Sequence, residues 1–181
     1  ERCPRAQQRE LALPLDARFY NDMSAVNGAA ADDVGLSTVA VSIQDASVAP
    51  PNCYNQALNT FTSPCPAWFK AAGSNSPWNV AFAAQPWIQA HQYVVRSSAT
   101  DLAGNVQVAL SSAGFTYDIG VPTAAVTAPA VAYFKDNTSF AGSAVDAPAG
   151  VANVFVALSS GTSALPAGSL GSWWSGAAFT D

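Results

Sequence analysis

Hydrophobic and polar residues alternate with a period of two along several short stretches of this chain. Val39, Val41 and Ile43, for example, are separated by the small or polar residues Ala40 and Ser42. This period is typical of a β-strand with one buried face. The pattern predicts strands at residues 38–44, 92–101 and 153–158, and a return strand that begins at 105–110 and ends near 115–118.

Turn-forming residues separate these stretches, as in the run Asp101-Leu102-Ala103-Gly104-Asn105. Recurring short strands between such turns predict an all-β fold, an antiparallel β-sandwich of the immunoglobulin-like kind. In that fold Tyr93 is expected to form a hydrogen-bonded corner that pins a loop to the start of its strand. His91, the single histidine, is expected either to be exposed to solvent or to pack at the same corner.

The chain also repeats itself. Gly28 and Asp32 each recur 114 positions later, as Gly142 and Asp146, and residues 35–43 match 150–158 at an offset of 115. With small gaps the match extends as far as residues 61–62, which correspond to residues 179–180. Self-similarity at a fixed period indicates an array of like modules.

The repeat predicts two modules of unequal completeness. Residues 1–120 form a complete sandwich with an inserted cysteine-containing loop, and residues 121–181 form the first half of a second one. Counterparts of residues 63–116 are missing from that second half. Because half a sandwich leaves sheet edges open, we expect it to be completed by further chain or by a neighbouring subunit. The chain begins at Glu1 without Met, so we expect a processed product or part of a longer protein.

Composition narrows the function classes. Only 10% of residues are charged and the net charge is −5, which argues against nucleic acid as a partner. No apolar run reaches the roughly 20 residues that span a bilayer, so no direct membrane insertion is expected.

Two motifs carry a family resemblance. The turn Ala99-Thr100-Asp101-Leu102-Ala103-Gly104-Asn105 and the joint Asp118-Ile119-Gly120-Val121-Pro122-Thr123 resemble those of tandem bacterial immunoglobulin-like repeats in large extracellular and surface proteins. The Gly-x-Ala-x-Asp segments that end at Asp32 and Asp146 are similar to that family too. The resemblance covers nearly the whole chain. It implies a fold more than a function, because such modules serve as stalks, adhesins, enzyme appendages and filament subunits.

The three cysteines suggest an oxidising compartment. Cys53 and Cys65 lie 12 apart in a stretch rich in Pro, Asn, Ser and Thr, which suits a disulfide that closes a surface loop. A zinc site is disfavoured, since one His and three scattered Cys lack paired ligand spacing. Cys3 is then left over for an intermolecular bond or a missing partner.

Few residues of the chain suggest catalysis, metal binding or modification. The chain has no nucleophile-elbow motif around any serine, so we expect no enzyme activity. Oxygen ligands from Asp32, Asp101, Asn105 and Asp118 would bind Ca²⁺ if the turns that carry them converge, and otherwise serve their own turns. No other cofactor is indicated. Asn137, in Asn137-Thr138-Ser139, is a possible glycosylation site.

Trp68, Trp78 and Trp87 lie in the irregular, Pro-rich region from 47 to 90. They either cover the core beneath long loops or present rings to a glycan, a protein or a neighbouring subunit. The sequence as a whole predicts a structural or adhesive module of a secreted bacterial surface protein or extracellular filament. Its expected partners are copies of itself or further modules of the same chain. A glycan- or protein-binding module that uses the tryptophans is the alternative.

Overall fold

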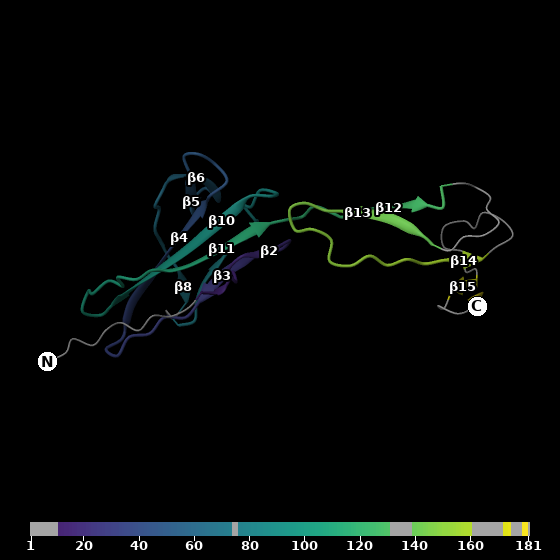
Figure 1. The fold of residues 1–181 in the computed structure, drawn as a ribbon. Coiled ribbons are helices and arrows are strands. Elements are labelled where there is room, and N and C mark those ends of the chain that lie inside the picture. The colour runs from purple at the N-terminus through teal and green to yellow at the C-terminus, as the bar shows by residue number, and fades with distance from the viewer. Residues whose placement is uncertain (1–10, 74–75, 131–138, 161–171, 175–178, 181) are drawn as a thin grey trace. The chain divides into compact units, whose positions relative to one another are not determined.

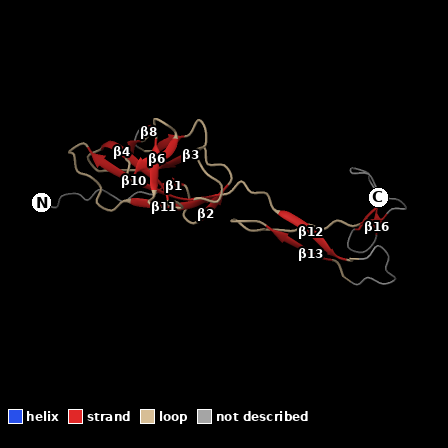
Figure 2. Ribbon diagram, turned by 90° about the horizontal axis from the view of Figure 1, so that it is seen from above, coloured by secondary structure: helices blue, strands red, loops and turns tan. Residues whose placement is uncertain are grey.

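The computed structural model describes residues 11–73, 76–130, 139–160, 172–174 and 179–180. These residues form strands and loops, with no helix among them (Figure 2), and therefore none that could cross a membrane. The predicted all-β fold class is confirmed. The chain divides into two compact units, Glu1–Val121 with Asp146–Ala149, and Pro122–Val145 with Gly150–Asp181.

The first unit is a sandwich of two sheets (Figure 1). The smaller sheet has the order β1-β3-β9-β8, made of β1 (Leu11–Leu13), β3 (Ala25–Gly28), β9 (Trp78–Ala81) and β8 (Ala72–Gly73). The larger has the order β2-β11-β10-β4-β5-β6, with β7 also paired to β4. Its strands are β2 (Arg18–Tyr20), β11 (Ser111–Tyr117), β10 (Gln92–Asp101), β4 (Leu36–Asp45), β5 (Asn52–Asn55), β6 (Thr60–Pro64) and β7 (Phe69–Lys70).

Strands β4 and β10 form the centre of the larger sheet. They run antiparallel along their whole length, from Tyr93 opposite Asp45 to Asp101 opposite Leu36. The residues that alternation placed on one face are the buried ones, Val39, Val41, Ile43, Tyr93 and Val95, each at most 1% exposed. The two predicted strands are therefore confirmed, and they face the core because of their period of two.

Aromatic rings fill the space between the two sheets. Trp87 contacts four of them, with ring centroids 4.9 to 5.7 Å away, namely Phe61, Phe82, Tyr93 and Phe115. Its indole N–H donates to the backbone carbonyl of Met23 at 2.8 Å. The ring thus packs on three strands of the larger sheet and on Phe82, which follows β9, and its polar atom is satisfied, as a buried Trp requires.

The return strand begins later than predicted. Val106 forms an isolated bridge with Thr100, the rest of residues 105–110 form a loop, and β11 starts at Ser111, opposite Ser97. Gln107 explains the difference: its backbone N–H donates to the Ala99 carbonyl at 2.8 Å, and its side-chain oxygen accepts from the Ala99 N–H at 3.1 Å. One residue thereby occupies both hydrogen-bonding groups of Ala99, and the chain loops out with Val108 97% exposed.

The described residues of the second unit form two small sheets. One pairs β12 (Thr123–Ala128) with β13 (Ala141–Val145). The other has the order β14-β15-β16, made of β14 (Ser159–Ser160), β15 (Ser172–Trp174) and β16 (Phe179–Thr180). Both consist of antiparallel pairs.

Candidate functional site

The corner of the first unit holds a carboxylate–imidazole pair. Asp45, at the end of β4, is 1% exposed, and its Oδ2 lies 2.8 Å from Nδ1 of His91. Its other oxygen accepts the backbone N–H of Ser47 at 2.9 Å. The Ser47 hydroxyl in turn accepts the N–H of Gln92 at 2.8 Å. Ser47 therefore connects the loop after β4 to the start of β10 by hydrogen bonds, and the cluster has a structural role.

Tyr93 forms the predicted corner. Its hydroxyl accepts the backbone N–H of Ile88, five residues upstream, at 2.8 Å. Burial raises the pKa of Tyr93 to about 12, and the Asp45 carboxylate adds to the rise. The phenol is thus held neutral, and it fixes the loop before β10 as the tyrosine corner does in other sandwiches.

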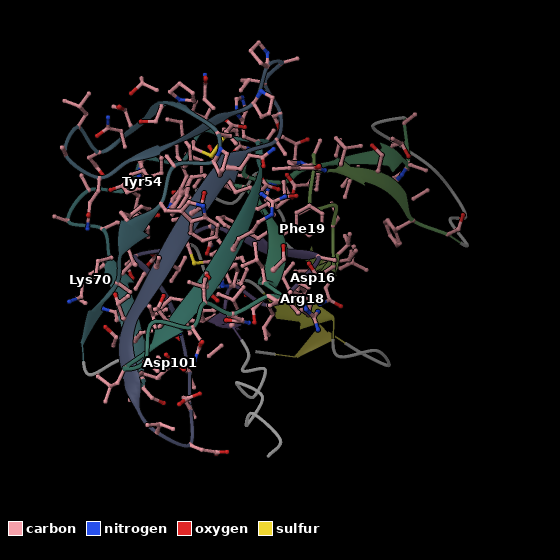
Figure 3. All side chains as sticks on the ribbon, turned by 90° about the vertical axis from the view of Figure 1, so that its left-hand side faces the viewer. Asp16, Arg18, Phe19, Tyr54, Lys70 and Asp101 are labelled. Atoms are coloured by element: carbon pink, nitrogen blue, oxygen red, sulfur yellow. A yellow bond between two sulfur atoms is a disulfide. The ribbon has the colours of Figure 1, made fainter. Side chains whose placement is uncertain are left out.

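Asp101 closes the turn after β10 (Figure 3). Its carboxylate accepts from both the backbone N–H and the side-chain amide of Asn105, each at 2.7 Å. Asp32 acts in the same way in its own turn, where Oδ1 accepts the N–H groups of Val34 and Gly35. These carboxylates serve the turns that carry them, the alternative to calcium stated above.

Asp32, Asp101 and Asn105 line one small pocket, whereas Asp118, the fourth oxygen ligand considered for Ca²⁺, lies apart from them. Asp118 follows β11 beside the start of β10, whereas Asp101 is the last residue of β10. A ten-residue strand is about 30 Å long, so the two carboxylates lie at opposite ends of the sheet. Asp118 accepts instead from the Gln89 side chain at 2.6 Å and from the Gly120 N–H at 2.9 Å. Among the residues that the structure describes, no group of three His, Cys, Asp or Glu could hold a metal ion.

Asp101 predicts a loss of stability in acid. The Asn105 amide lowers the pKa of Asp101, and backbone N–H groups of the turn lower it further. The unfolded carboxyl titrates near pH 4, so the stabilisation is complete above that value and is lost as pH falls through the lower folded pKa. We expect the melting temperature of Asp101→Asn to lie below that of the parent protein at pH 7, and the gap to narrow below about pH 4. Thermal melts between pH 7 and 2.5 measure this, and a gap that stays constant would contradict it.

The three tryptophans do not form an exposed platform. Trp78 and Trp87 are 1% and 8% exposed and belong to the core cluster, which is the first of the two alternatives stated above. Only Trp68 of the three is open to solvent, at 41%. A binding function would therefore rest on Trp68 alone.

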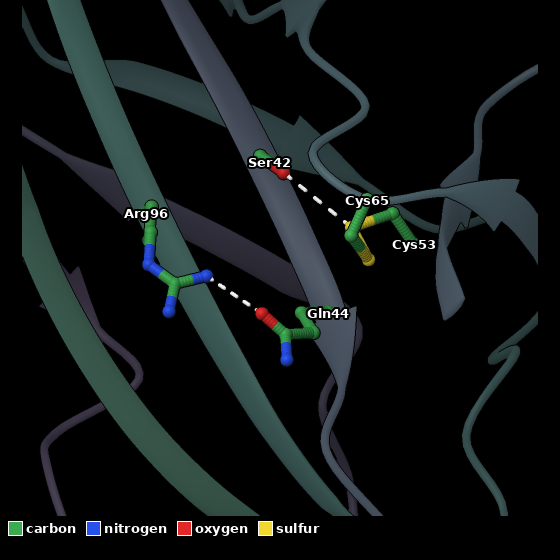
Figure 4. The surroundings of a disulfide bond; sticks show 5 residues. All are labelled: Ser42, Gln44, Cys53, Cys65 and Arg96. Carbon is green, nitrogen blue, oxygen red and sulfur yellow. Dashed lines mark hydrogen bonds between the residues drawn. A yellow bond between two sulfur atoms is a disulfide. The ribbon is translucent and has the colours of Figure 1, made fainter. Parts of the chain in front are cut away.

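The predicted disulfide is present. Cys53 and Cys65 are bonded, with their Cα atoms 5.1 Å apart. Figure 4 shows the bond beside β4, where the Ser42 hydroxyl lies 3.8 Å from the Cys53 sulfur. On the neighbouring strand Arg96 donates to the side-chain oxygen of Gln44 at 2.8 Å. Cys3 and Asn137 lie outside the described residues.

The second unit repeats the strand pairing of the first. In β1 and β3, Leu11 lies opposite Gly28 and Leu13 opposite Asn27, with an irregularity between the two pairs. In β12 and β13, the corresponding pairs are Val126 with Gly142 and Ala128 with Ala141, again with an irregularity between them. Gly28 and Gly142 are the glycines that the sequence repeat matched. The two units therefore share the register of this strand pair as well as its sequence pattern.

The other small sheet repeats β4, β5 and β6. In the first unit Gln44 pairs with Cys53 and Tyr54 with Phe61. In the second unit the matching pairs are Ser159 with Trp173 and Trp174 with Phe179. Ser159 is the equivalent of Gln44 at the offset of 115. Strands β14, β15 and β16 thus correspond to the end of β4, to β5 and to β6.

Residues 151–158 pair with no strand among the described residues of this copy. They correspond to residues 36–43 of β4, which pair with β10 along their length, but here they form no strand. Their apolar side chains are open to water: Val154 is 60% exposed, Phe155 92% and Val156 71%. Val39 and Val41, the equivalents of Val154 and Val156, are fully buried. We call residues 151–158 the open segment.

The predicted strand at residues 153–158 is wrong, because the structure has no strand before Ser159 in this segment. Its alternation predicted pairing, and the missing counterparts of residues 63–116 were visible. Phe155, the most exposed large side chain of the segment, was not singled out. It stands where the first unit has Ala40, and this exchange of a small residue for an aromatic one is the signal that could have found it.

Comparison with known proteins identifies no family for this chain. No family model matches the chain, and no curated protein matches its sequence. Among solved structures it is similar to CopC from Methylosinus trichosporium OB3b, with 13% identity and a TM-score of 0.38, over 61% of this chain and 94% of that one. At this level of similarity the comparison carries no argument about function, which rests on the residues of the chain itself.

Proposed function

We propose that this chain is a structural or adhesive element of a secreted bacterial surface protein or extracellular filament, built from tandem immunoglobulin-like sandwich modules. The observation that carries the proposal is the repeated register of the two units, β1 with β3 and β12 with β13. A sandwich that is duplicated down to an irregularity in one strand pair is a unit of an array. Arrays of like modules provide length and surface rather than a single active site.

Further features support this assignment. The Cys53–Cys65 disulfide fits an oxidising, extracellular setting. The charged and polar groups most suited to catalysis, those of Asp45, His91 and Asp101, are engaged in holding turns and loops. The proposal therefore includes no enzymatic activity. It assigns as partners further modules of the same kind, in the same chain or in copies of it.

Localisation in the producing cells tests the proposal. An antibody raised against the purified chain should label the cell surface or extracellular filaments in immunogold electron micrographs. Pre-immune serum is the control. Labelling confined to the cytoplasm would contradict the proposal, whatever the chain binds in solution.

A further inference from the structure

A short segment that follows β13 lies with the first unit. Residues 122–145 and 150–181 form the second unit, but Asp146–Ala149 between them belong to the first. The chain therefore passes from one unit to the other three times, at 121–122, 145–146 and 149–150. We call Asp146–Ala149 the return segment.

The carboxylate of Asp118 holds the return segment. Its Oδ2 accepts the backbone N–H of Ala149 at 2.9 Å, while Oδ1 accepts from the Gln89 side chain and from the Gly120 N–H. The Gln89 amide lowers the pKa of Asp118, and the two backbone N–H groups lower it further against the opposing effect of burial. The backbone N–H of Asp118 donates to the Tyr20 carbonyl of β2 at 2.8 Å. A charged acceptor is thus fixed to the sheet of the first unit.

Gly120 permits the close approach of the return segment. A Cβ atom at this position would lie 3.0 Å from Oδ1 of Asp118 and 3.1 Å from the side-chain nitrogen of Gln89. It would also lie 3.4 Å from the carbonyl oxygen of Ala147. Any other residue at position 120 would therefore push the acceptor, its Gln89 partner or the return segment away.

The first unit caps the equivalent backbone amide in a different way. At the offset of 115, Ala149 corresponds to Val34, whose N–H donates to Oδ1 of Asp32 in the same loop at 2.9 Å. Asp146 is the equivalent of Asp32 at the offset of 114, so the second loop is one residue longer. The Asp146 carboxylate accepts no hydrogen bond from a described residue. The amide that its own loop caps in the first unit is capped by Asp118 in the second copy.

We propose that Asp118, Gln89 and Gly120 form a docking site for the return segment, which fastens the chain of the following module at a second point besides the linker. This rests on the proposed function, since a module needs such a site only in an array. The site takes a loop with a free backbone N–H.

The loop of the first unit does not fit the same site. The N–H groups of Val34 and Gly35 already donate to Asp32. A second copy of this chain therefore has no free amide to offer there. The longer loop is what makes the return segment the preferred occupant.

Amide exchange of the full 181-residue chain, followed residue by residue by NMR, tests the proposal. We expect Asp118→Ala to speed exchange at Ala149 by at least about tenfold and to leave Val34 unchanged, because only the first amide loses its acceptor. Asp32→Ala is the matched variant and should do the opposite. Unchanged exchange at Ala149 in Asp118→Ala would overturn the proposal.

A second variant covers the case in which Asp118→Ala unfolds the first unit, which exchange throughout β4 would reveal. Gly120→Ala keeps the carboxylate but crowds the site, and should also speed exchange at Ala149. Ile119→Ala is its control, because this exposed side chain lies between the two and should leave the rate unchanged. Equal rates at Ala149 in both variants would contradict the site.

The choice of acceptor and occupant is checked separately. Asp146→Asn should leave exchange at Ala149 unchanged, and a rate as high as in Asp118→Ala would show that the loop caps itself and overturn the proposal. Exchange at Val34 that slows with protein concentration would overturn the choice of occupant. The immunogold result stands apart: surface labelling with no effect of Asp118→Ala keeps the proposed function and removes this inference, and the reverse outcome keeps the docking site and removes the function.

Discussion

Replacing Trp87 by alanine is expected to lower the free energy of unfolding of the first unit by about 3–5 kcal/mol, the usual cost of removing a buried Trp or Phe side chain. Domains of this kind are stable by only about 5–15 kcal/mol, so the variant should be close to unfolding. The reason is geometric: Trp87 touches Phe61, Phe82, Tyr93 and Phe115, and no neighbour can fill the space it leaves.

Urea titration followed by circular dichroism measures the loss. Trp87→Phe separates packing from hydrogen bonding, because it keeps a ring but leaves the Met23 carbonyl without its donor, at a cost of about 1–3 kcal/mol. Trp68→Ala is the matched control, since that side chain is 41% exposed and its removal should change stability by about 0.5 kcal/mol. Equal midpoints for Trp87→Ala and Trp68→Ala would contradict the role given to Trp87.

The tryptophans also show a limit of prediction from the sequence. Trp68, Trp78 and Trp87 lie in one Pro-rich region without periodicity, so nothing in the sequence separates core from surface there. The separation depends on pairing across the sandwich: Trp78 lies on β9, opposite Gly28 of β3. A long-range pairing of this kind leaves no local signal, and β8 and β9 were not predicted for the same reason.

Strands with a strong period were predictable. The alternation around Val41 and Val95 identified β4 and β10, because burying one face of a central strand requires that pattern. The start of β11 was not predictable, since Val106 and Val108 alternate as strand residues do. Val106 still bridges Thr100, but after it the side chain of Gln107 takes the place of a backbone partner for Ala99, and Val108 lies in the loop. A competition between side chain and backbone is decided by geometry rather than by pattern.

The distances between turns could not be predicted from the sequence either. Asp101 and Asp118 are 17 positions apart, and that separation is compatible with adjacent turns. The return strand β11 fills the interval and carries Asp118 to the far end of the sheet. Only the strand boundaries reveal that Asp118 lies apart from Asp101 and Asn105.

The repeat was the most productive sequence feature. The repeat aligns Gly28 with Gly142, and the pairings of β3 and β13 agree with that alignment. Whether the second module is completed, and from where, stays a prediction. What the fold adds is that residues 151–158 form no strand, whereas their equivalents in β4 pair with β10 and, at Ala40 and Val41, also with β7.

Removing the Cys53–Cys65 disulfide is expected to destabilise the first unit by about 3 kcal/mol, the value for a closed loop of this size. The bond joins β5 to the end of β6, the outermost strand of its sheet, so without it the unfolded chain gains freedom and that edge is held by the ladder alone. The double variant Cys53→Ala/Cys65→Ala tests this without placing a polar atom at position 53, which is 1% exposed.

With urea slopes of about 1–3 kcal/mol per molar, this loss corresponds to a midpoint lower by about 1–3 M. Dithiothreitol should shift the parent protein by a similar amount and leave the double variant where it is, which separates the bond from the side chains that form it. A reductant effect of equal size on both proteins would trace the loss to something other than this disulfide. An unchanged midpoint in the double variant would show that β6 is held by its aromatic contacts, in which Phe61 packs on Tyr54, Trp87 and Tyr93. The loop closed by the cysteines would then be a local feature that the core does not need.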